Sequence, residues 1–305
     1  MNRDIYFRQA NLMLQILPFV MKPDCFALKG GTAINFFTRD LPRLSIDIDL
    51  AYLSIRGREE SIKEISDTMQ SVSTAVKKFF KEIKIVPKKS LDSDRWKGMI
   101  VQKDNVVVKI EPNLVIRGTV FPCEVRDLSV DAENIFEMSL SVKTLSFADL
   151  YGGKLCAALD RQHPRDLFDM KLLLDNEGLR DDVRKAFIVY LISHNRPIHE
   201  LLEPGSVDIK HLFENEFLGM TRIEIKYEEL IETKSKLIER VKNDLTVKEK
   251  EFLLSLKRKD PTWDLFEISG IDQLPAVRWK LLNLKKMSKT AHFKALTKLE
   301  KVLYS

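Results

Sequence analysis

The chain has 305 residues, 44% of them hydrophobic, and its fifty basic and forty-five acidic residues give a formal net charge of +5. This length exceeds the size at which one hydrophobic core usually stops growing, so two domains are expected. Charges of both signs are mixed along the chain, which excludes a disordered polyelectrolyte, and no apolar run approaches membrane-spanning length. These features predict a globular cytoplasmic protein without membrane contact.

The three cysteines support the same compartment. Cys25, Cys123 and Cys156 lie far apart, and none has CxxC or Cys/His metal-ligand spacing. An odd number without a pairing framework predicts reduced, buried thiols.

The first half of the sequence alternates helical and strand patterns. Helices are expected over residues 4–21, 33–39 and 58–83, and strands over residues 25–28, 44–52, 99–102, 106–111 and 123–128. Gly30 and Gly31 end the first strand, and Thr32 is expected to cap the following helix. Asp104 and Asn105 suit a hairpin turn. This half is predicted to be an α/β (α+β) domain with a mixed sheet.

From residue 146 onward nearly every segment has helical periodicity. Helices are expected over residues 147–161, 164–176, 181–193, 223–242 and 248–257, followed by a basic tail. The change of pattern near residue 145 predicts a first domain of residues 1–145 and an all-helical domain of residues 146–305.

The basic tail begins at Arg278 and contains a single acid, Glu300. Its basic residues are Arg278, Lys280, Lys285, Lys286, Lys289, Lys294, Lys298 and Lys301. Such a positive surface attracts phosphate backbones. The alternative is a solvated amphipathic helix whose apolar stripe runs from Leu281 to Val302.

The first candidate functional segment is Lys29-Gly30-Gly31-Thr32. A strand that ends in Gly-Gly and leads into a helix exposes backbone N–H groups at a positive helix terminus, with no side chain to obstruct a phosphate. The segment therefore predicts a phosphate-binding turn, although tight turns of purely structural origin share this pattern.

The second candidate is the carboxylate pair Asp47 and Asp49. Residues two apart on a strand point to the same face, about 7 Å apart along the backbone. Two acids on one strand repel each other, so a hard cation such as Mg²⁺ gives a reason for them. With the Gly-Gly turn about fifteen residues earlier, the pair predicts a nucleotide site.

These motifs resemble a known superfamily. Gly30-Gly31-Thr32 followed by Arg43, Ser45 and Asp47-Ile-Asp49-Leu50 is similar to the GG[ST]…DxD signature of the DNA polymerase β-type nucleotidyltransferases, with threonine where serine is usual. Lys154 to Arg161 followed by Arg165-Asp166-Leu-Phe-Asp169-Met170 resembles the later block of the AbiEii/AbiGii-type toxins from type IV toxin–antitoxin and abortive-infection systems. The resemblance covers roughly residues 25 to 175.

The resemblance implies that Asp47 and Asp49 hold catalytic Mg²⁺ and that Lys154 and Asp166 are needed for activity. Lys154 and Arg161 share a helix face and can meet a triphosphate, and Arg165 belongs to the same block. Read without the resemblance, Lys154 is a solvated helix position and Asp166 an acid in a first helical turn, able to orient a neighbouring Lys or Arg.

The superfamily usually adds a third carboxylate from a neighbouring strand. Glu111, which ends the strand over residues 106–111, is the best-placed candidate as metal ligand or general base. The alternative is an acid at a strand end before Pro112.

The predicted function is therefore transfer of a nucleoside monophosphate from an NTP to an acceptor hydroxyl. The resemblance implies a toxin neutralised by a cognate antitoxin, with RNA, particularly the tRNA acceptor end, as substrate. Two alternatives stay open: a small-molecule nucleotidyltransferase of the antibiotic-modifying kind, and a non-catalytic nucleic-acid or partner-binding protein on the same fold.

Overall fold

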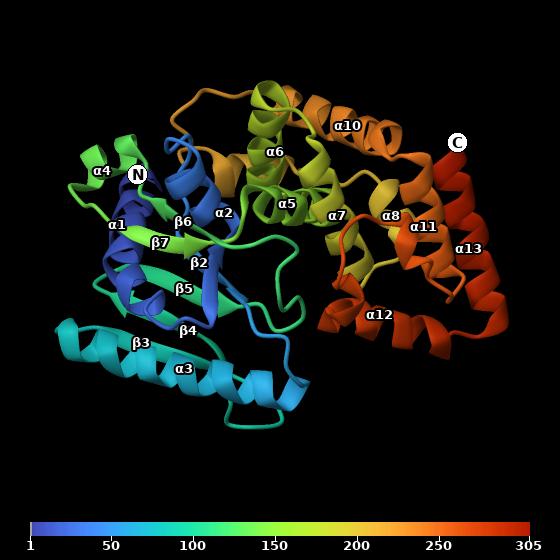
Figure 1. Ribbon diagram of the computed structural model, residues 1–305. Coiled ribbons are helices and arrows are strands. Elements are labelled where there is room, and N and C mark those ends of the chain that lie inside the picture. Colours follow the sequence, from blue (N-terminus) through green and yellow to red (C-terminus); the bar gives the residue numbers. More distant parts are fainter. Residues whose placement is uncertain (1) are drawn as a thin grey trace. The chain divides into compact units, whose positions relative to one another are not determined.

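The computed structural model describes residues 2–305 and divides into two compact units (Figure 1). The first unit comprises Met1–Ser146 together with Phe217–Glu224, and the second comprises Phe147–Glu216 together with Ile225–Ser305. The main division falls between residues 146 and 147, where the sequence changes from mixed to helical periodicity. The architecture is the predicted one, an α/β unit and a helical unit.

The first unit is built on a mixed sheet, which has seven strands in the described part of the chain, in the order β3-β4-β5-β2-β1-β7-β6. The strands are β1 (Phe26–Lys29), β2 (Asp47–Tyr52), β3 (Lys84–Lys89), β4 (Trp96–Lys103), β5 (Val106–Pro112), β6 (Glu124–Asp127) and β7 (Ser141–Thr144). β2 runs antiparallel to β1 and parallel to β5. β2 lies between β5 and β1, and these two neighbours determine which of its side chains point to each face of the sheet.

Helices α1 (Asn2–Val20) and α3 (Arg58–Phe79) pack against this sheet. Their buried faces follow the helical spacing of apolar residues, for example Ile65, Met69, Val72 and Val76 in α3. The remaining helical segments of this unit are α2 (Gly30–Ala33), the π-helix η1 (Ile34–Thr38) and α4 (Val130–Phe136).

Several local expectations were wrong. The chain from residue 30 to 38 is a short α-helix followed by a π-helix, and Thr32 lies inside α2 and does not cap it. Strands β3 and β7 were not expected, and the helix over residues 58–83 ends at Phe79. Of the cysteines, only Cys156 is fully buried, whereas Cys25 and Cys123 are half-buried.

A segment from the second half of the chain completes the first unit. Thr221 forms an isolated antiparallel bridge with Arg43, and the Leu44 N–H donates to the Met220 carbonyl over 2.8 Å. The Arg222 N–H donates to the Pro42 carbonyl over 2.9 Å. Phe217–Glu224 therefore pairs with the stretch that leads into β2, although the sequence pattern placed it in the helical domain.

The second unit is helical throughout. Its helices are α5 (Phe147–Arg161), α6 (Pro164–Asn176), α7 (Asp181–Ser193), α8 (Ile198–Leu202), α9 (Lys210–Leu212), α10 (Tyr227–Asp244), α11 (Val247–Lys257), α12 (Pro275–Lys286) and α13 (Lys289–Tyr304), with the short segments η2 (Phe213–Phe217), η3 (Trp263–Leu265) and η4 (Ile271–Gln273). α5 packs closely on α7 at Gly152, which has no side chain. A Cβ at this position would lie only 2.7 Å from the Cβ of Ala186.

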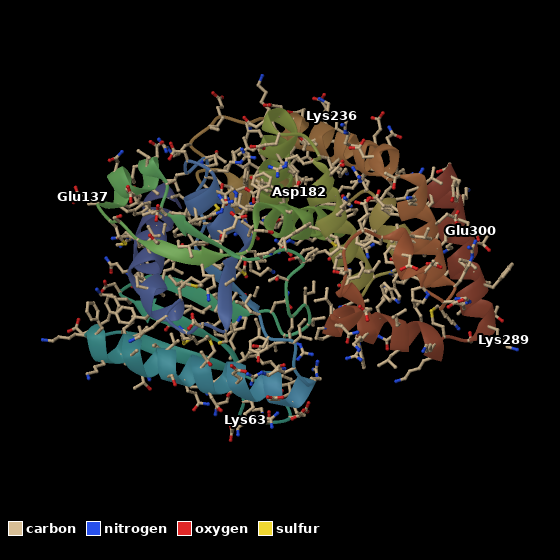
Figure 2. The ribbon with its side chains drawn as sticks, viewed as in Figure 1. Lys63, Glu137, Asp182, Lys236, Lys289 and Glu300 are labelled. Carbon is tan, nitrogen blue, oxygen red and sulfur yellow. The ribbon has the colours of Figure 1, made fainter. Side chains whose placement is uncertain are left out.

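The basic tail forms α12 and α13. Leu284, Leu299 and Val302 are buried, so part of the expected apolar stripe does pack inward. The lysines of the tail project from the helices, as Lys289 does in Figure 2, except for Lys280, which is largely buried. No helix within residues 2–305 has the length and apolar content needed to cross a bilayer.

Candidate active site

The glycine turn and the carboxylate strand meet at Gly30 and Asp49. Gly30 has φ of +73°, which is unfavourable for residues with a Cβ, and a Cβ at this position would clash with Asp49 Oδ2. Lys29, the last residue of β1, is the register partner of Asp49 on β2. The absence of a side chain at Gly30 therefore makes room for the Asp49 carboxylate.

Gly31 and Thr32 are held by the stretch that leads into β2. A Cβ at Gly31 would lie 2.8 Å from Arg43 Nη2 and 3.0 Å from Ser45 Oγ. The Thr32 hydroxyl is 3.0 Å from Ser45 Oγ and 2.5 Å from the Asp47 carbonyl oxygen. Threonine thus supplies the hydroxyl expected at this position, and it ties the turn to the carboxylate strand.

The acids of β2 share one face of the sheet. Ile48 is fully buried on the opposite face, whereas Asp47 and Asp49 are half-exposed. In the parallel pairing of β2 with β5, Asp49 is the partner of Glu111, so both side chains point to the same face. The neighbouring strand thus carries the Glu111 carboxylate on the same face as Asp49.

Glu111 has a cationic partner of its own. Its Oε1 is 2.5 Å from the ammonium of Lys88 on β3, and the strand between them carries Gly98 as the register partner of Lys88. Within residues 2–305, no three His, Cys, Asp or Glu side chains converge closely enough to form a metal site by themselves. Glu111 therefore lies beside Asp47 and Asp49, but the three carboxylates do not converge on one point.

The donor set of this face suits a hard divalent cation. Carboxylate oxygens are the ligands that Mg²⁺ prefers, and Mg²⁺ commonly binds through one or two carboxylates together with substrate phosphates. Asp47 and Asp49 supply two carboxylates on one face of β2, and the Asp49 carboxylate lies directly against the Gly30 turn. The residues present fit a Mg²⁺ ion that is completed by a nucleotide.

The second unit holds a buried charged cluster of its own. The ammonium of Lys154 on α5 lies 2.8 Å from Asp166 Oδ1 and 3.1 Å from Asp169 Oδ2, both on α6. All three side chains are at most 7% exposed. Burial alone would raise the pKa of Asp166, but the charges of Lys154 and Arg161 hold it well below its usual range.

Arg161 is the exposed cation of this cluster. Its Nε donates to Asp166 Oδ2 over 2.5 Å and its Nη2 to Oδ1 over 3.0 Å, while 60% of its side chain is exposed. Asp166 sits in the first turn of α6, as expected, and it does orient both basic neighbours. Lys154, by contrast, is not a solvated helix position.

Arg165 does not join the cluster. It is half-buried and lies 3.9 Å from Glu216, while its backbone N–H donates to Nδ1 of His163. His163 therefore caps α6, and burial together with the charge of Arg165 lowers its pKa. Of the residues in the later block, the structure brings together Lys154, Arg161, Asp166 and Asp169.

Two residues of these clusters were not given a role from sequence. Asp169 is the second carboxylate on Lys154, and its position three residues after Asp166 on one helix face was the available signal. Arg43 is buried beneath Gly31 and donates to the Leu44 carbonyl over 2.9 Å. The signal available for Arg43 in the sequence was its place in the motif.

A strand that ends in Gly-Gly, a carboxylate pair on the adjacent strand and a separate Lys-Asp-Arg block together define the nucleotidyltransferase class of enzymes. Residues 11–281 match the family model described as nucleotidyl transferase AbiEii toxin, type IV TA system. The chain belongs to this AbiEii family and is a nucleotidyltransferase toxin of a toxin–antitoxin system.

The solved structures include a protein of the same fold. The nucleotidyltransferase toxin MenT4 of Mycobacterium tuberculosis H37Rv matches with a TM-score of 0.57 and 15% sequence identity, and the match covers 100% of each chain. No curated protein sequence matches this chain. The structural likeness therefore concerns the fold, and the family rests on the sequence match.

Proposed function

We propose that this toxin transfers the nucleoside monophosphate of an NTP to a hydroxyl group of RNA, with tRNA as the acceptor and Mg²⁺ as the cofactor. The observation that carries the proposal is the close packing of Gly30 against the Asp49 carboxylate, with Asp47 on the same strand face. This packing joins a phosphate-binding turn to a cation-binding strand.

In the proposed reaction the acceptor oxygen attacks the α-phosphorus of the NTP, and the bond to the bridging oxygen of the pyrophosphate breaks. Gly30, Gly31 and Thr32 orient the phosphates through the turn, and Lys29 and Ser45 stand beside it. Mg²⁺ held by Asp47 and Asp49 would neutralise charge on the phosphates. Glu111 would take the proton of the acceptor hydroxyl as general base, or it would serve as a further ligand of the cation.

The buried cluster of the second unit is proposed to be needed for activity as well. Lys154 and Asp166 bond to each other, and Arg161 presents its guanidinium to solvent from the same carboxylate. Lys154 is proposed to offset charge that develops on the phosphates, with Arg161 as the more accessible cation. Arg165 remains a proposed phosphate contact on the resemblance alone.

RNA is favoured over a small-molecule acceptor by the surface of α12 and α13. Lys285, Lys286, Lys289, Lys294, Lys298 and Lys301 are all exposed there. A surface of this kind attracts a polyanion such as RNA, whereas it would not attract a small neutral acceptor. A cognate antitoxin protein is the proposed partner, and the cytoplasm the proposed compartment.

The test is to incubate the protein with each α-labelled NTP, Mg²⁺ and total RNA, and to follow label in RNA on a gel. Labelling of a tRNA-sized band by the wild type and none by Asp49→Asn is expected. Label in small molecules but not in RNA would refute the acceptor, and equal labelling by both proteins would refute the site.

A further inference from the structure

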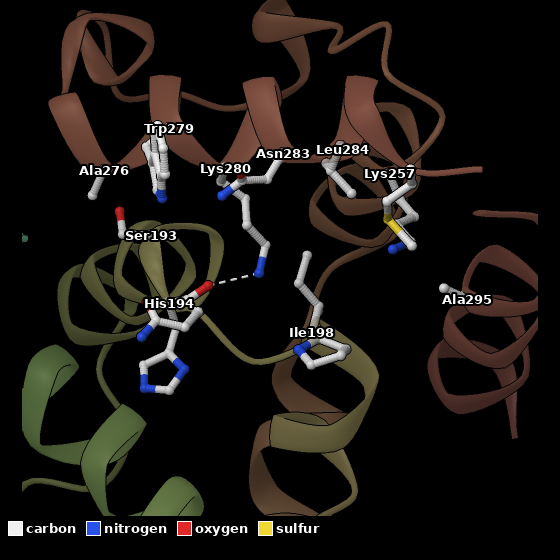
Figure 3. A pocket seen from close by; sticks show the side chains of 13 residues that line it. Ser193, His194, Ile198, Lys257, Ala276, Trp279, Lys280, Asn283, Leu284 and Ala295 are labelled. Atoms are coloured by element: carbon white, nitrogen blue, oxygen red, sulfur yellow. Dashed lines mark hydrogen bonds between the residues drawn. The ribbon is translucent and has the colours of Figure 1, made fainter. Parts of the chain in front are cut away.

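A cavity of 240 Å³ opens within the helical unit, between the C-terminal end of α7, the start of α8 and helices α11, α12 and α13 (Figure 3). None of the residues that line it, all within the described chain, is acidic. Two lysines line it, Lys257 from α11 and Lys280 from α12, and Figure 3 shows both side chains at the cavity. The cavity is therefore positively charged.

Lys257 has no partner for its charge. Its side chain is buried, with the residue 7% exposed, yet within residues 2–305 its ammonium makes no hydrogen bond or ion pair. Burial and the nearby charge of Lys259 lower its pKa. A partly buried ammonium group without a counter-charge is costly, so a bound anion would relieve this cost.

Lys280 has a partial structural explanation. Its ammonium donates to the carbonyls of His194 over 2.6 Å and Arg196 over 2.7 Å, which lie just after the end of α7. These bonds use two of its three donors, and the third is left for a ligand. Burial and the charge of Lys257 lower its pKa to about 8, so the two lysines do repel each other.

The rim of the cavity offers a flat contact surface. Trp279 lines the cavity, and 56% of it is exposed, with the ammonium of Lys286 5.9 Å from the ring centroid. The side-chain amides of Asn195 and Asn283 add hydrogen-bonding groups to the same lining. An exposed indole is a stacking platform for a nucleobase.

We infer that this cavity binds a nucleotide that ends in a phosphate monoester, with the phosphate at Lys257 and Lys280 and the base on Trp279. A phosphate monoester carries a charge of about −1.5 to −2 at neutral pH, which matches two ammonium groups, whereas an internal phosphodiester or a carboxylate carries only one negative charge. The ligand has two possible sources, a free mononucleotide and the phosphorylated end of an RNA.

The experiment is a fluorescence titration of the full-length protein with 5′-AMP and 5′-CMP in metal-free buffer. The Asp49→Asn background removes binding that depends on the carboxylate pair, so the result does not depend on the proposed transfer reaction. Saturable quenching is expected, and Trp279→Phe should change its amplitude while the signals of Trp96 and Trp263 persist. Absence of saturable binding would overturn the proposal.

Three variants locate the site. Lys257→Met should weaken binding about tenfold or more, since a bond to a charged group is lost, and Lys257→Arg should restore most of it. Lys285→Met removes an exposed lysine of α12 that does not line the cavity, and it should leave binding unchanged. Equal weakening by Lys257→Met and Lys285→Met would show a general charge effect and would also overturn the proposal.

The folding of Lys257→Met is checked by its melting temperature without ligand. It should equal or exceed that of the wild type, because a partly buried charge without a counter-charge is removed. Two short RNAs of the same sequence, one with a 5′-phosphate and one without it, separate the two sources of the ligand. If only the phosphorylated RNA competes with 5′-AMP, the ligand is an RNA end. Competition by neither assigns the site to free mononucleotides.

Discussion

The Asp49 carboxylate occupies the space that a side chain at Gly30 would fill. This relationship joins two motifs that are separated by η1 and the stretch that leads into β2, and it makes the glycine necessary for two reasons. The backbone at Gly30 has φ of +73°, and its hydrogen faces the Asp49 carboxylate.

Gly30→Ala should therefore reduce transfer activity and lower stability together. A left-handed backbone conformation with a Cβ costs about 1–3 kcal/mol, and the Asp49 carboxylate would be displaced as well. Gly205→Ala is the matched control, since a Cβ there meets nothing within 4 Å. Urea unfolding and NTP turnover measure the two effects, and a fully active Gly30→Ala variant would contradict the assigned turn.

The three acids of the carboxylate face should differ in their importance. Asp47→Asn and Asp49→Asn should each lower turnover about a thousandfold or more, as expected when several kcal/mol of charge stabilisation is lost. Glu111→Gln should cost about a hundredfold or more if it acts as general base. Asp67→Asn, an exposed acid on α3, controls for net charge. Normal turnover of Glu111→Gln would exclude it from the chemistry.

Lys154 should be important for folding as well as for activity. Lys154→Met removes the buried cation that bonds to both Asp166 and Asp169, which costs about 3–5 kcal/mol. Arg161→Met should cost much less, because its side chain is 60% exposed. Trp263 and Trp279 lie in the helical unit and report its unfolding in urea. Equal stability of the two variants would contradict the structural role.

The same pair separates a catalytic role from a structural one. Under conditions where both variants are folded, a remaining loss of kcat in Lys154→Met with little change in KM indicates action on charge that develops during transfer. A raised KM with unchanged kcat would indicate a substrate clamp.

The basic surface of α12 and α13 should be visible in the salt dependence of RNA binding. Each phosphate contact to single-stranded RNA contributes about 0.7 to the slope of log K against log salt, so changing Lys285, Lys286, Lys289 and Lys294 to Gln should lower the slope by up to roughly 3. The control changes Lys63, Lys77, Lys78 and Lys81 of the α3 region to Gln, with the same loss of charge. Equal slopes for both fourfold variants would exclude the tail as the RNA surface.

The cavity of the helical unit should lose its affinity for anions in alkaline solution. The pKa of Lys280 is lowered to about 8 by burial and by Lys257, with smaller opposing effects of Cys156 and Glu200. Sulfate binding, measured by calorimetry from about pH 7 to about pH 10, should therefore weaken as pH rises through about 8. Lys280→Met should bind more weakly and lose this step, and a flat profile for the wild type would contradict a charged Lys280 in the site.

The stability of the unliganded protein should change in the opposite direction. Because the folded state lowers the pKa of Lys280, the unfolded chain binds more protons between about pH 8 and the ordinary pKa of 10.5. The free energy of unfolding gains a positive contribution across this interval, and Lys280→Met should lack it.

Sequence patterns were sufficient for the elements whose signals are local. The alternation of Asp47, Ile48 and Asp49 predicted the carboxylate face, and the boundaries of α5, α6 and α7 agree with the helical periodicity. The sequence pattern did not predict β3, because β3 is a charged edge strand that contains Pro87. It did not predict β7, because this strand has only four residues.

The parts that were missed depend on tertiary contacts. The burial of Lys154 follows from the packing of α6 on α5, and nothing in the periodicity of α5 distinguishes a lysine bonded to two acids from a solvated one. The unpaired Lys257 and the cavity around it likewise arise from segments far apart in the chain, which no local pattern joins.

The return of Phe217–Glu224 to the α/β unit has a consequence for biosynthesis. The strand pairing of Arg43 with Thr221 and the backbone bonds of Pro42 and Leu44 support the stretch that carries Ser45 and leads to Asp47. Domains tend to fold as they leave the ribosome, from the N-terminus onward. The α/β unit of this toxin, however, cannot be completed until the whole stretch Phe147–Glu216 has also been synthesised. A nascent or prematurely terminated chain would thus lack the backbone pairing that supports the stretch before Asp47.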